Sequence, residues 1–241
     1  MLTTVAVLPE PPLLVPELAN GATAETGELR AACLTAAARL ASAARRWVAI
    51  GADPGGRRTV DPRTRGSFVG FGVDLVVGLD TTGSAGPVDP RLPLPLLIAG
   101  WVAAGVDGSI RIRGELIGSA DPPSACAALG AELAAEWASD PEPVGLLVLG
   151  DGAATHTERA PGHFDGRAAA FDAGVVAALR DADRAALATL DAELATQLLA
   201  AGRPAWQVLA AATAGIDWSG ELLHSTAPFG VAYHVAVWTP R

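Results

Sequence analysis

The sequence predicts a single α/β domain over residues 1–241, with a central, mostly parallel sheet flanked by helices on both faces. Three observations predict this fold class. Apolar segments of strand length alternate with alanine-rich segments of helical period along the chain. Residues 144–149, VGLLVL, are continuously apolar, as is typical of a parallel strand buried on both faces. Hydrophobic residues make up 50% of the 241 positions, enough for one sizeable core.

In the first half of the chain, a strand at residues 3–8 precedes a helix at 21–46 and a strand at 47–50. This order predicts a parallel βαβ unit. Residues 67–79 are expected to form either one long strand or two short ones, and the glycines among them suggest a bulge. The elements expected next are a helix at 93–105, a strand at 109–117 and a helix at 122–138, which a proline can start.

In the second half, the strand at residues 144–149 is the clearest one in the chain. The helices expected after it lie at 168–180, at 184–201 with a break near Asp191, and at 204–214. Two strands at 221–224 and 231–238 end the chain. No internal repeat or linker divides the sequence, so we expect one domain.

The charge balance argues against a nucleic-acid-binding surface. The chain has 26 acidic residues against 17 basic ones, all arginine, and a net charge of −9. Binding to phosphates requires clustered cations. The densest basic stretch, GGRRTVDPRTRG at residues 55–66, is rich in glycine and proline and is interpreted as a solvated loop.

Cysteine usage and hydropathy indicate a cytoplasmic protein that does not cross a membrane. Cys33 and Cys126 lie in separate alanine-rich segments, which favours buried free thiols in a reducing compartment. The longest apolar stretch, residues 92–106, contains two prolines and is too short to span a bilayer. No basic segment precedes the first apolar run, so we expect no signal peptide.

Three carboxylates follow the three best candidates for parallel strands: Glu10, Asp53 and Asp151. Ligand sites in such sheets lie outside the carboxyl ends of the strands. Three acids at one edge would form an oxygen site for Mg²⁺, Mn²⁺ or Ca²⁺, or would raise one another's pKa enough to hold a proton. The alternative is that aspartates beside glycine only shape turns or cap the following helix.

Three segments of the sequence resemble, in the same order, the class III extradiol ring-cleavage dioxygenases. These are PEPPLLVPEL near the start, LGDGAATHTERAPGHFDGRAAAFD after the strand at 144–149, and APFGVAYHVAVW at the end. The likeness is to the B-subunit-like branch that includes the Memo proteins, and it extends over the whole chain. Its most specific part is TERAPGHFDGRAAAFD.

The resemblance implies a ferrous site, yet this chain departs from it at each ligand. In the family, two histidines and a glutamate bind Fe²⁺ and leave open positions for a catecholate and dioxygen. Glu10 stands where the first histidine belongs, Asp53 lies near the second, and Thr226 occupies the place of the glutamate. The cofactor is therefore unknown: iron as in the family, a harder divalent ion, or none.

The resemblance also implies an acid/base histidine after the strand at residues 144–149. An alignment without gaps places Ala154 at that position, and His156 lies two residues further along. His156 and Asp151 are therefore the candidate catalytic residues, with Glu10 and Asp53 as candidate metal ligands. A loop site formed by His156, Glu158 and His163 is a weaker candidate.

Three functions follow as hypotheses. The first is an extradiol-dioxygenase-like pseudo-enzyme that has lost its iron triad and binds a small aromatic molecule, another small molecule or a partner. The second is a hydrolase that uses Glu10, Asp53 and Asp151 around a divalent ion. The third is an active ring-cleavage dioxygenase with relocated ligands. Members of the family commonly dimerise, so a homodimer is a candidate assembly.

Overall fold

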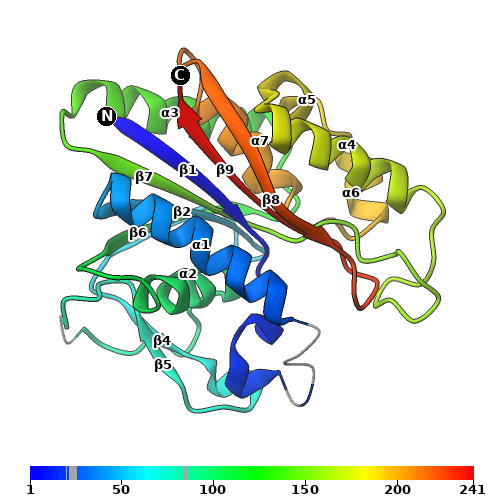
Figure 1. Ribbon diagram of the computed structural model, residues 1–241, viewed down its shortest axis with the longest axis horizontal. Helices are drawn as coiled ribbons and strands as arrows, with labels where there is room; N and C mark the ends of the chain where they lie inside the picture. Colours follow the sequence, from blue (N-terminus) through cyan, green and yellow to red (C-terminus); the bar gives the residue numbers. More distant parts are fainter. Residues whose placement is uncertain (20, 22–25, 84–85) are drawn as a thin grey trace.

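The computed structural model describes residues 1–19, 21, 26–83 and 86–241. Within them the chain folds around a seven-stranded sheet with the order β3-β6-β2-β7-β1-β9-β8 (Figure 1). The strands are β1 (Leu2–Leu8), β2 (Arg46–Asp53), β3 (Arg58–Val60), β6 (Arg111–Gly118), β7 (Val144–Leu149), β8 (Trp218–Thr226) and β9 (Tyr233–Pro240). The four central strands, β6, β2, β7 and β1, are parallel, whereas β3, β9 and β8 are antiparallel to their neighbours.

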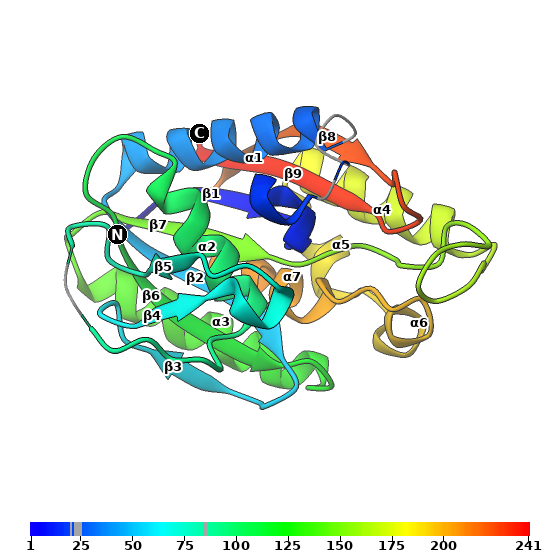
Figure 2. The same ribbon diagram turned by 90° about the horizontal axis from the view of Figure 1, so that it is seen from below.

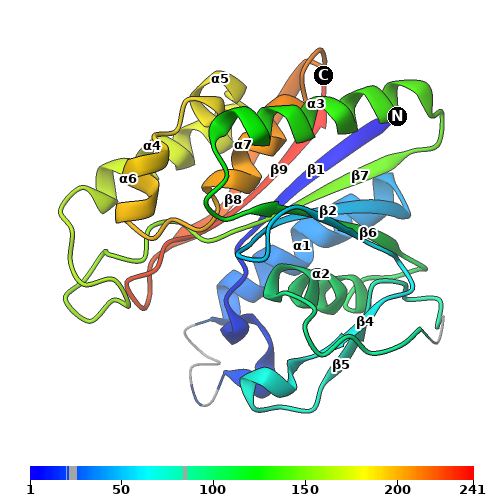
Figure 3. The ribbon, with the colours of Figure 1, turned by 180° about the vertical axis from the view of Figure 1, so that it is seen from behind.

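Helices cover both faces of this sheet, which confirms the predicted fold class. The helices α1 (Gly27–Ala43) and α2 (Leu94–Ala104) pack on one face. The other face carries α3 (Pro123–Ser139), α4 (Ala168–Asp181), α5 (Arg184–Ala188), α6 (Ala192–Gln197) and α7 (Arg203–Ala212). Figure 2 shows α1 above the sheet, and Figure 3 shows α3 and α7 along the opposite face.

One segment settles an alternative that the sequence left open, and another differs from the prediction. Two short strands, not one long strand, occupy the region of residues 67–79: β4 (Arg65–Ser67) and β5 (Val76–Gly78) make a separate hairpin, with a 3₁₀ turn at Phe68–Phe71 in place of a bulge. The arginine-rich stretch expected to be a loop contains β3, which pairs with β6. The sequence pattern did not predict β3, because a strand of three residues carries too few positions to show alternation.

The remaining elements match the expected ones with shifted ends. The helix expected at residues 21–46 is α1, which begins at Gly27, and residues 22–25 of that prediction lie outside the described part of the chain. The break expected near Asp191 is real, because Asp191 caps α6 by accepting from the amides of Glu193 and Leu194. Strand β2 extends to Asp53, three residues beyond its expected end.

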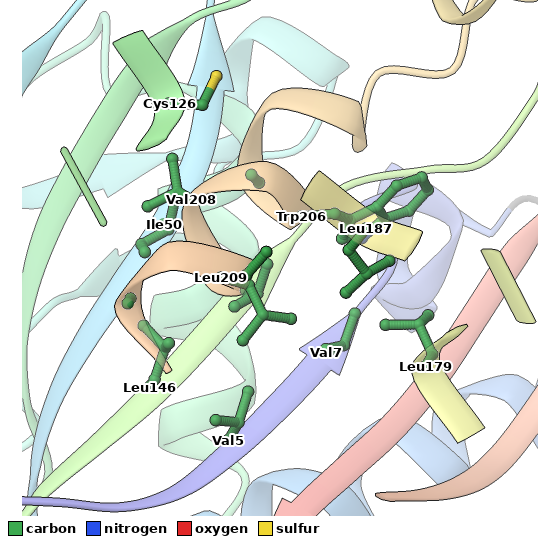
Figure 4. Packing of buried hydrophobic residues seen from close by; sticks show 14 of the residues in the cluster. Val5, Val7, Ile50, Cys126, Leu146, Leu179, Leu187, Trp206, Val208 and Leu209 are labelled. Carbon is green, nitrogen blue, oxygen red and sulfur yellow. The ribbon is translucent and has the colours of Figure 1, made fainter. Parts of the chain in front are cut away.

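The core divides into two layers, one on each side of the sheet. The layer under α3, α4 and α7 includes Val7, Ile50, Leu146 and the buried Trp206 (Figure 4). Cys126 belongs to this layer and Cys33 to the layer under α1 and α2. Both cysteines are buried and free, as the sequence predicted. In the described part of the chain, none of the helices has the length and apolar character needed to cross a membrane.

The packing of α3 against α7 depends on a glycine. A Cβ atom at Gly130 would lie 2.5 Å from the carbonyl oxygen of Val208 and 2.6 Å from the Cβ of Ala211. Backbone atoms of α7 cannot yield as a flexible side chain can, so the two helices approach closely only because Gly130 has no side chain.

We therefore expect Gly130→Ala to destabilise the protein by about 1–3 kcal/mol, because the added methyl forces α3 away from α7. Gly174→Ala is the matched control, since Gly174 is also inside a helix but has no atom within 4 Å of an added Cβ. The control should leave stability unchanged or raise it by about 0.5–1 kcal/mol through its better helix propensity. Urea denaturation of both variants measures the difference, and equal stabilities would contradict the packing argument.

Candidate functional site

The ends of β1 and β7 bring two carboxyl groups together. The backbone amide of Gly150 donates to the carbonyl of Leu8 at 3.1 Å, which keeps the two chains paired just beyond the strands. The next contact is between the candidate residues, because the amide of Glu10 donates to Oδ1 of Asp151 at 2.8 Å. Prolines on both sides of Glu10 restrict the backbone there and have no amide to compete for this carboxylate.

The surroundings of this pair favour the protonated forms. Burial, and then the charge of Asp151, raises the pKa of Glu10 well above its ordinary value. Burial also raises the pKa of Asp151 to about 7, against a smaller opposing effect of the hydrogen bond from the Glu10 amide. Oε2 of Glu10 is buried and has no hydrogen-bond partner among the residues that the structure describes. Within the described residues neither carboxyl has an ion pair, so near neutral pH the pair holds at least one proton.

The charge of Asp151 also raises the pKa values of two nearby side chains, Tyr233 and Cys33. The pKa of the Tyr233 hydroxyl is raised by burial and by Asp151. The pKa of the Cys33 thiol is raised by the same two causes and slightly lowered by Arg30. The Arg30 guanidinium donates instead to the carbonyls of Leu13 and Leu14 and to the hydroxyl of Thr26. The environment of the pair is therefore acidic, and the arginine that reaches this region is held by other acceptors.

Asp53 does not join the pair. Strand β2 leaves β7 after Ile50 but continues along β6, so its last residue lies on the β6 side of the sheet. There the Asp53 carboxylate lies 3.7 Å from Nη2 of Arg58 on β3. The sequence predicts a strand that ends at Ile50, with Asp53 at the same edge as Glu10 and Asp151. Because β2 continues along β6 to Asp53, the three carboxylates do not meet. Across the described part of the chain, no group of three or more His, Cys, Asp and Glu side chains is arranged to hold a metal ion.

His156 belongs to a second polar cluster, centred on Asp172 of α4. Nε2 of His156 lies 2.6 Å from Oδ2 of Asp172, and Nε2 of His234 on β9 lies 3.2 Å from Oδ1. The amide of Ala153 also donates to this carboxylate, at 3.2 and 3.3 Å from its two oxygens. Nδ1 of His234 lies 3.0 Å from the hydroxyl of Ser225 on β8. We call these four side chains, Ser225, His234, Asp172 and His156, the Asp172 network.

The Asp172 network fixes how both imidazoles face the carboxylate. Asp172 is only 5% exposed. A carboxylate oxygen can only accept a hydrogen bond, so each contact with it needs the form of the imidazole in which Nε2 carries a proton. In neutral His156, Nδ1 then keeps its lone pair and can accept a proton, the arrangement in which a carboxylate orients a histidine for acid/base work. The side chain of His156 is 18% exposed, whereas that of His234 is 2% exposed.

A glycine allows the chain after β7 to approach this network. A Cβ atom at Gly152 would lie 2.5 Å from Oδ1 of Asp172 and 2.9 Å from Nε2 of His234. Gly152 thus lies between the two clusters along the chain. The residue before it, Asp151, belongs to the carboxyl pair, and the amide of the residue after it, Ala153, donates to the Asp172 network. Tyr233 and His234 are adjacent on β9 and belong one to each cluster, because successive strand residues point to opposite faces.

Asp172, His234 and Ser225 are not among the candidate site residues predicted from the sequence. A signal for Asp172 exists, because it lies on the same face of α4 as the buried residues Ala168, Val175 and Leu179. A carboxylate on an apolar helix face requires a buried partner.

The other residues singled out in the sequence lie outside both clusters. Ala154 is buried and donates its amide to the carbonyl of Leu198. Thr226 is half-buried at the end of β8, opposite Tyr233. His163 lies in an exposed loop with a positive φ of 61°.

The donor set does not fit the ferrous centre that the resemblance implies. Fe²⁺ in a site with open positions favours two imidazole nitrogens and one carboxylate on one face. The strand-end pair supplies only carboxyl oxygens. Both ring nitrogens of the buried His234 are engaged, one by Asp172 and one by Ser225, and Nε2 of His156 is engaged by Asp172 as well. These histidines are thus committed to a carboxylate and not turned toward Glu10.

The raised pKa of Asp151 predicts how stability varies with pH. A carboxyl whose folded pKa lies above its unfolded value binds its proton more tightly in the folded chain, so its contribution is present at low pH. That contribution is lost as pH rises from the ordinary value of 3.8 toward about 7. Asp151→Asn removes this titration, while its amide oxygen can still accept from the Glu10 amide.

We expect wild type to lose stability relative to Asp151→Asn between about pH 4 and about pH 7, as measured by urea denaturation. Asp74→Asn, which changes an exposed carboxylate on the β4–β5 hairpin, is the control and should parallel wild type. Parallel pH profiles of wild type and Asp151→Asn would show that Asp151 is already ionised in the weakly acidic range.

Comparisons with known proteins support the fold and leave the activity open. No model of a protein family matches the chain, and no curated protein matches it. Among solved structures, it is similar to the crystal structure of the uncharacterized protein JW3007 from Escherichia coli K12, with a TM-score of 0.52 and 14% identity. The match covers 98% of this chain and 99% of that one, so the likeness concerns the whole fold.

Proposed function

We propose that this chain is a divergent extradiol-dioxygenase-like protein that binds a small molecule at the ends of β1 and β7 without ferrous chemistry. The observation that carries the proposal is the part-buried contact between the Glu10 amide and the Asp151 carboxylate, at the place where the resemblance would put an iron ligand. A pair of carboxyl groups that holds a proton is a poor site for Fe²⁺ but a good partner for a hydroxyl group.

The same pair explains why a small aromatic ligand with hydroxyl groups suits the proposal. A protonated carboxyl can donate one hydrogen bond, and the other carboxyl can accept one. Burial of the site makes each of these bonds stronger than it would be in water. Catechols are therefore the first ligands to test, with binding expected and turnover not expected.

A second candidate is an enzyme that uses a hard divalent ion, which one observation favours. Oε2 of Glu10 is buried and finds no partner in the described ranges of the chain, and an Mg²⁺ or Mn²⁺ ion would satisfy it together with Asp151. Such an ion would displace the proton that the pair holds, so its binding would strengthen as pH rises toward about 7, where Asp151 ionises. Asp53 would not contribute in the observed arrangement, since its carboxylate faces Arg58.

The test combines metal analysis, ligand binding and oxygen uptake on the purified protein. We expect no stoichiometric iron, no oxygen uptake with a catechol panel with or without added Fe²⁺, and binding of at least one catechol. Asp151→Asn should weaken that binding by about tenfold, the effect of losing one hydrogen bond to a charged group. The exposed variant Asp74→Asn should bind like wild type.

The other outcomes distinguish the alternatives. Stoichiometric iron with oxygen uptake would overturn the proposal and establish an active dioxygenase with relocated ligands. Binding of Mg²⁺ or Mn²⁺ that is lost in Glu10→Gln would favour the metal-dependent enzyme. Failure of every catechol to bind would leave the carboxyl pair without the ligand class proposed here and would refute this part of the account.

A further inference from the structure

Three members of the Asp172 network form a chain of side chains that runs from the surface into the core. Ser225, near the end of β8, is exposed, whereas His234 on β9 and Asp172 on α4 are buried. The hydroxyl of Ser225 lies 3.0 Å from Nδ1 of His234. On the other side of the ring, Nε2 of His234 lies 3.2 Å from Oδ1 of Asp172. A hydroxyl, an imidazole and a carboxylate thus follow one another within hydrogen-bond distance.

A shift of register in β8 places Ser225 opposite the histidine. The pairing of β8 with β9 shifts by one residue between Leu222 and His224, so β8 has one extra residue there. Ser225 consequently lies opposite His234, whereas an unshifted ladder would put His224 at that place. Opposite residues of antiparallel strands have their side chains on the same face, with Cβ atoms about 4.5–5.5 Å apart. Such bulges re-aim side chains and are frequent beside active sites.

The contact with Asp172 determines which nitrogen of His234 can act as a base. A carboxylate oxygen only accepts, so this contact needs a proton on Nε2. In neutral His234 the free lone pair is then on Nδ1, where it accepts the hydrogen bond of the Ser225 hydroxyl. Either ring nitrogen can serve as the base when a partner holds the proton on the other one. His234 therefore has the form needed to remove the proton of Ser225.

Asp172 is itself held in position by other donors. The amide of Ala153 donates to it, and Nε2 of His156 lies 2.6 Å from Oδ2, the oxygen that His234 does not contact. When His234 takes the serine proton it becomes a cation, and the fixed carboxylate stabilises that charge. Because both groups are buried, this attraction is stronger than it would be in water.

The residue that would attack a substrate is the one that solvent reaches. Strand β8 is at one edge of the seven-stranded sheet, and Ser225 is exposed on it, so a small molecule can approach its hydroxyl directly. The same strand offers an internal comparison. Ser219 is also exposed on β8, but it lies opposite Thr239 and so faces no imidazole across the strands. Exposure alone therefore does not distinguish the two serines, whereas the histidine does.

We propose that Ser225 is a nucleophile that accepts the acyl group of a small carboxylic ester. His234 is its base, and Asp172 is the positioning residue that orients His234. A nucleophile and a base in contact, with a third group that orients the base, is the arrangement that activates a serine hydroxyl on many unrelated folds. The proposal uses neither Glu10 nor Asp151, so it does not rest on the function proposed for the carboxyl pair.

The reaction has two steps. In the first, Oγ of Ser225 bonds to the carbonyl carbon of the ester, the bond from that carbon to the alcohol oxygen breaks, and the serine proton passes through Nδ1 of His234 to the departing alcohol. In the second, water adds to the acyl carbon, the bond to Oγ breaks, and a proton of the water passes through the same nitrogen back to Oγ. Ester and water thus give acid and alcohol, and Ser225 is restored.

Labelling with an alkyl fluorophosphonate, which bonds to an activated serine Oγ with loss of fluoride, tests the nucleophile when the labelled peptides are identified by mass spectrometry. In wild type we expect Ser225 to be labelled about 100-fold faster than Ser219 or more, the effect of one general base. His234→Gln should slow labelling of Ser225 by a similar factor, because the glutamine amide can donate to Asp172 but is not basic.

Hydrolysis of 4-nitrophenyl acetate tests acyl transfer through the release of 4-nitrophenolate. We expect Ser225→Ala to reduce this release to the rate without protein, because the variant has no Oγ to accept the acetyl group. Ser219→Ala is the matched control and should hydrolyse the ester like wild type, since it removes an exposed serine from the same strand.

Thermal unfolding midpoints show whether the variants are folded. If His234→Gln is not, the comparison of Ser225 with Ser219 in wild type carries the test, because it needs no substitution. Equal labelling of the two serines, or labelling of neither, would overturn the proposal. Unchanged labelling of Ser225 in folded His234→Gln would overturn the role of the histidine. Release of 4-nitrophenolate that persists in Ser225→Ala would place the reaction elsewhere and refute acyl transfer to Ser225.

Discussion

The chemistry of this protein depends on two interacting carboxyl groups, one buried and one partly exposed, that have no counter-ion in the described part of the chain. Glu10 and Asp151 meet because β1 and β7 are adjacent parallel strands and the chain stays paired for one further hydrogen bond past their ends. Ionising both groups there would place two like charges in a medium of low dielectric constant. A proton or a cation must therefore accompany the pair, and this requirement limits every function that the site can have.

The requirement also separates this site from the ferrous centre of the family that the sequence resembles. An iron site with two imidazoles relies on neutral nitrogen donors, which do not repel one another when the metal leaves. Here the neighbouring histidines are turned to Asp172, on the other side of Gly152, where they stabilise a buried carboxylate of their own. The fold thus keeps acids and histidines in two clusters, and each cluster satisfies its own charges.

Features that depend on a few adjacent residues could be predicted from the sequence, whereas features that depend on contacts between distant residues could not. The βαβ unit and the strand at residues 144–149 were predictable because their pattern lies within a few adjacent residues. The approach of Glu10 and Asp151 was predictable as well, since both follow strands that had to be parallel. The separation of Asp53 was not, because it depends on β2 leaving β7 while it continues along β6. The Asp172 network joins residues up to 62 positions apart, and no local pattern specifies such contacts.

The most direct test of the central claim is to follow the side-chain carboxyl carbons of Glu10 and Asp151 by NMR as pH is changed, with Glu10→Gln and Asp151→Asn used for assignment. The account predicts that at least one of the two groups is still protonated well above the ordinary range of carboxyl pKa values, with the transition of Asp151 near pH 7. Complete ionisation of both groups below about pH 5 would contradict it.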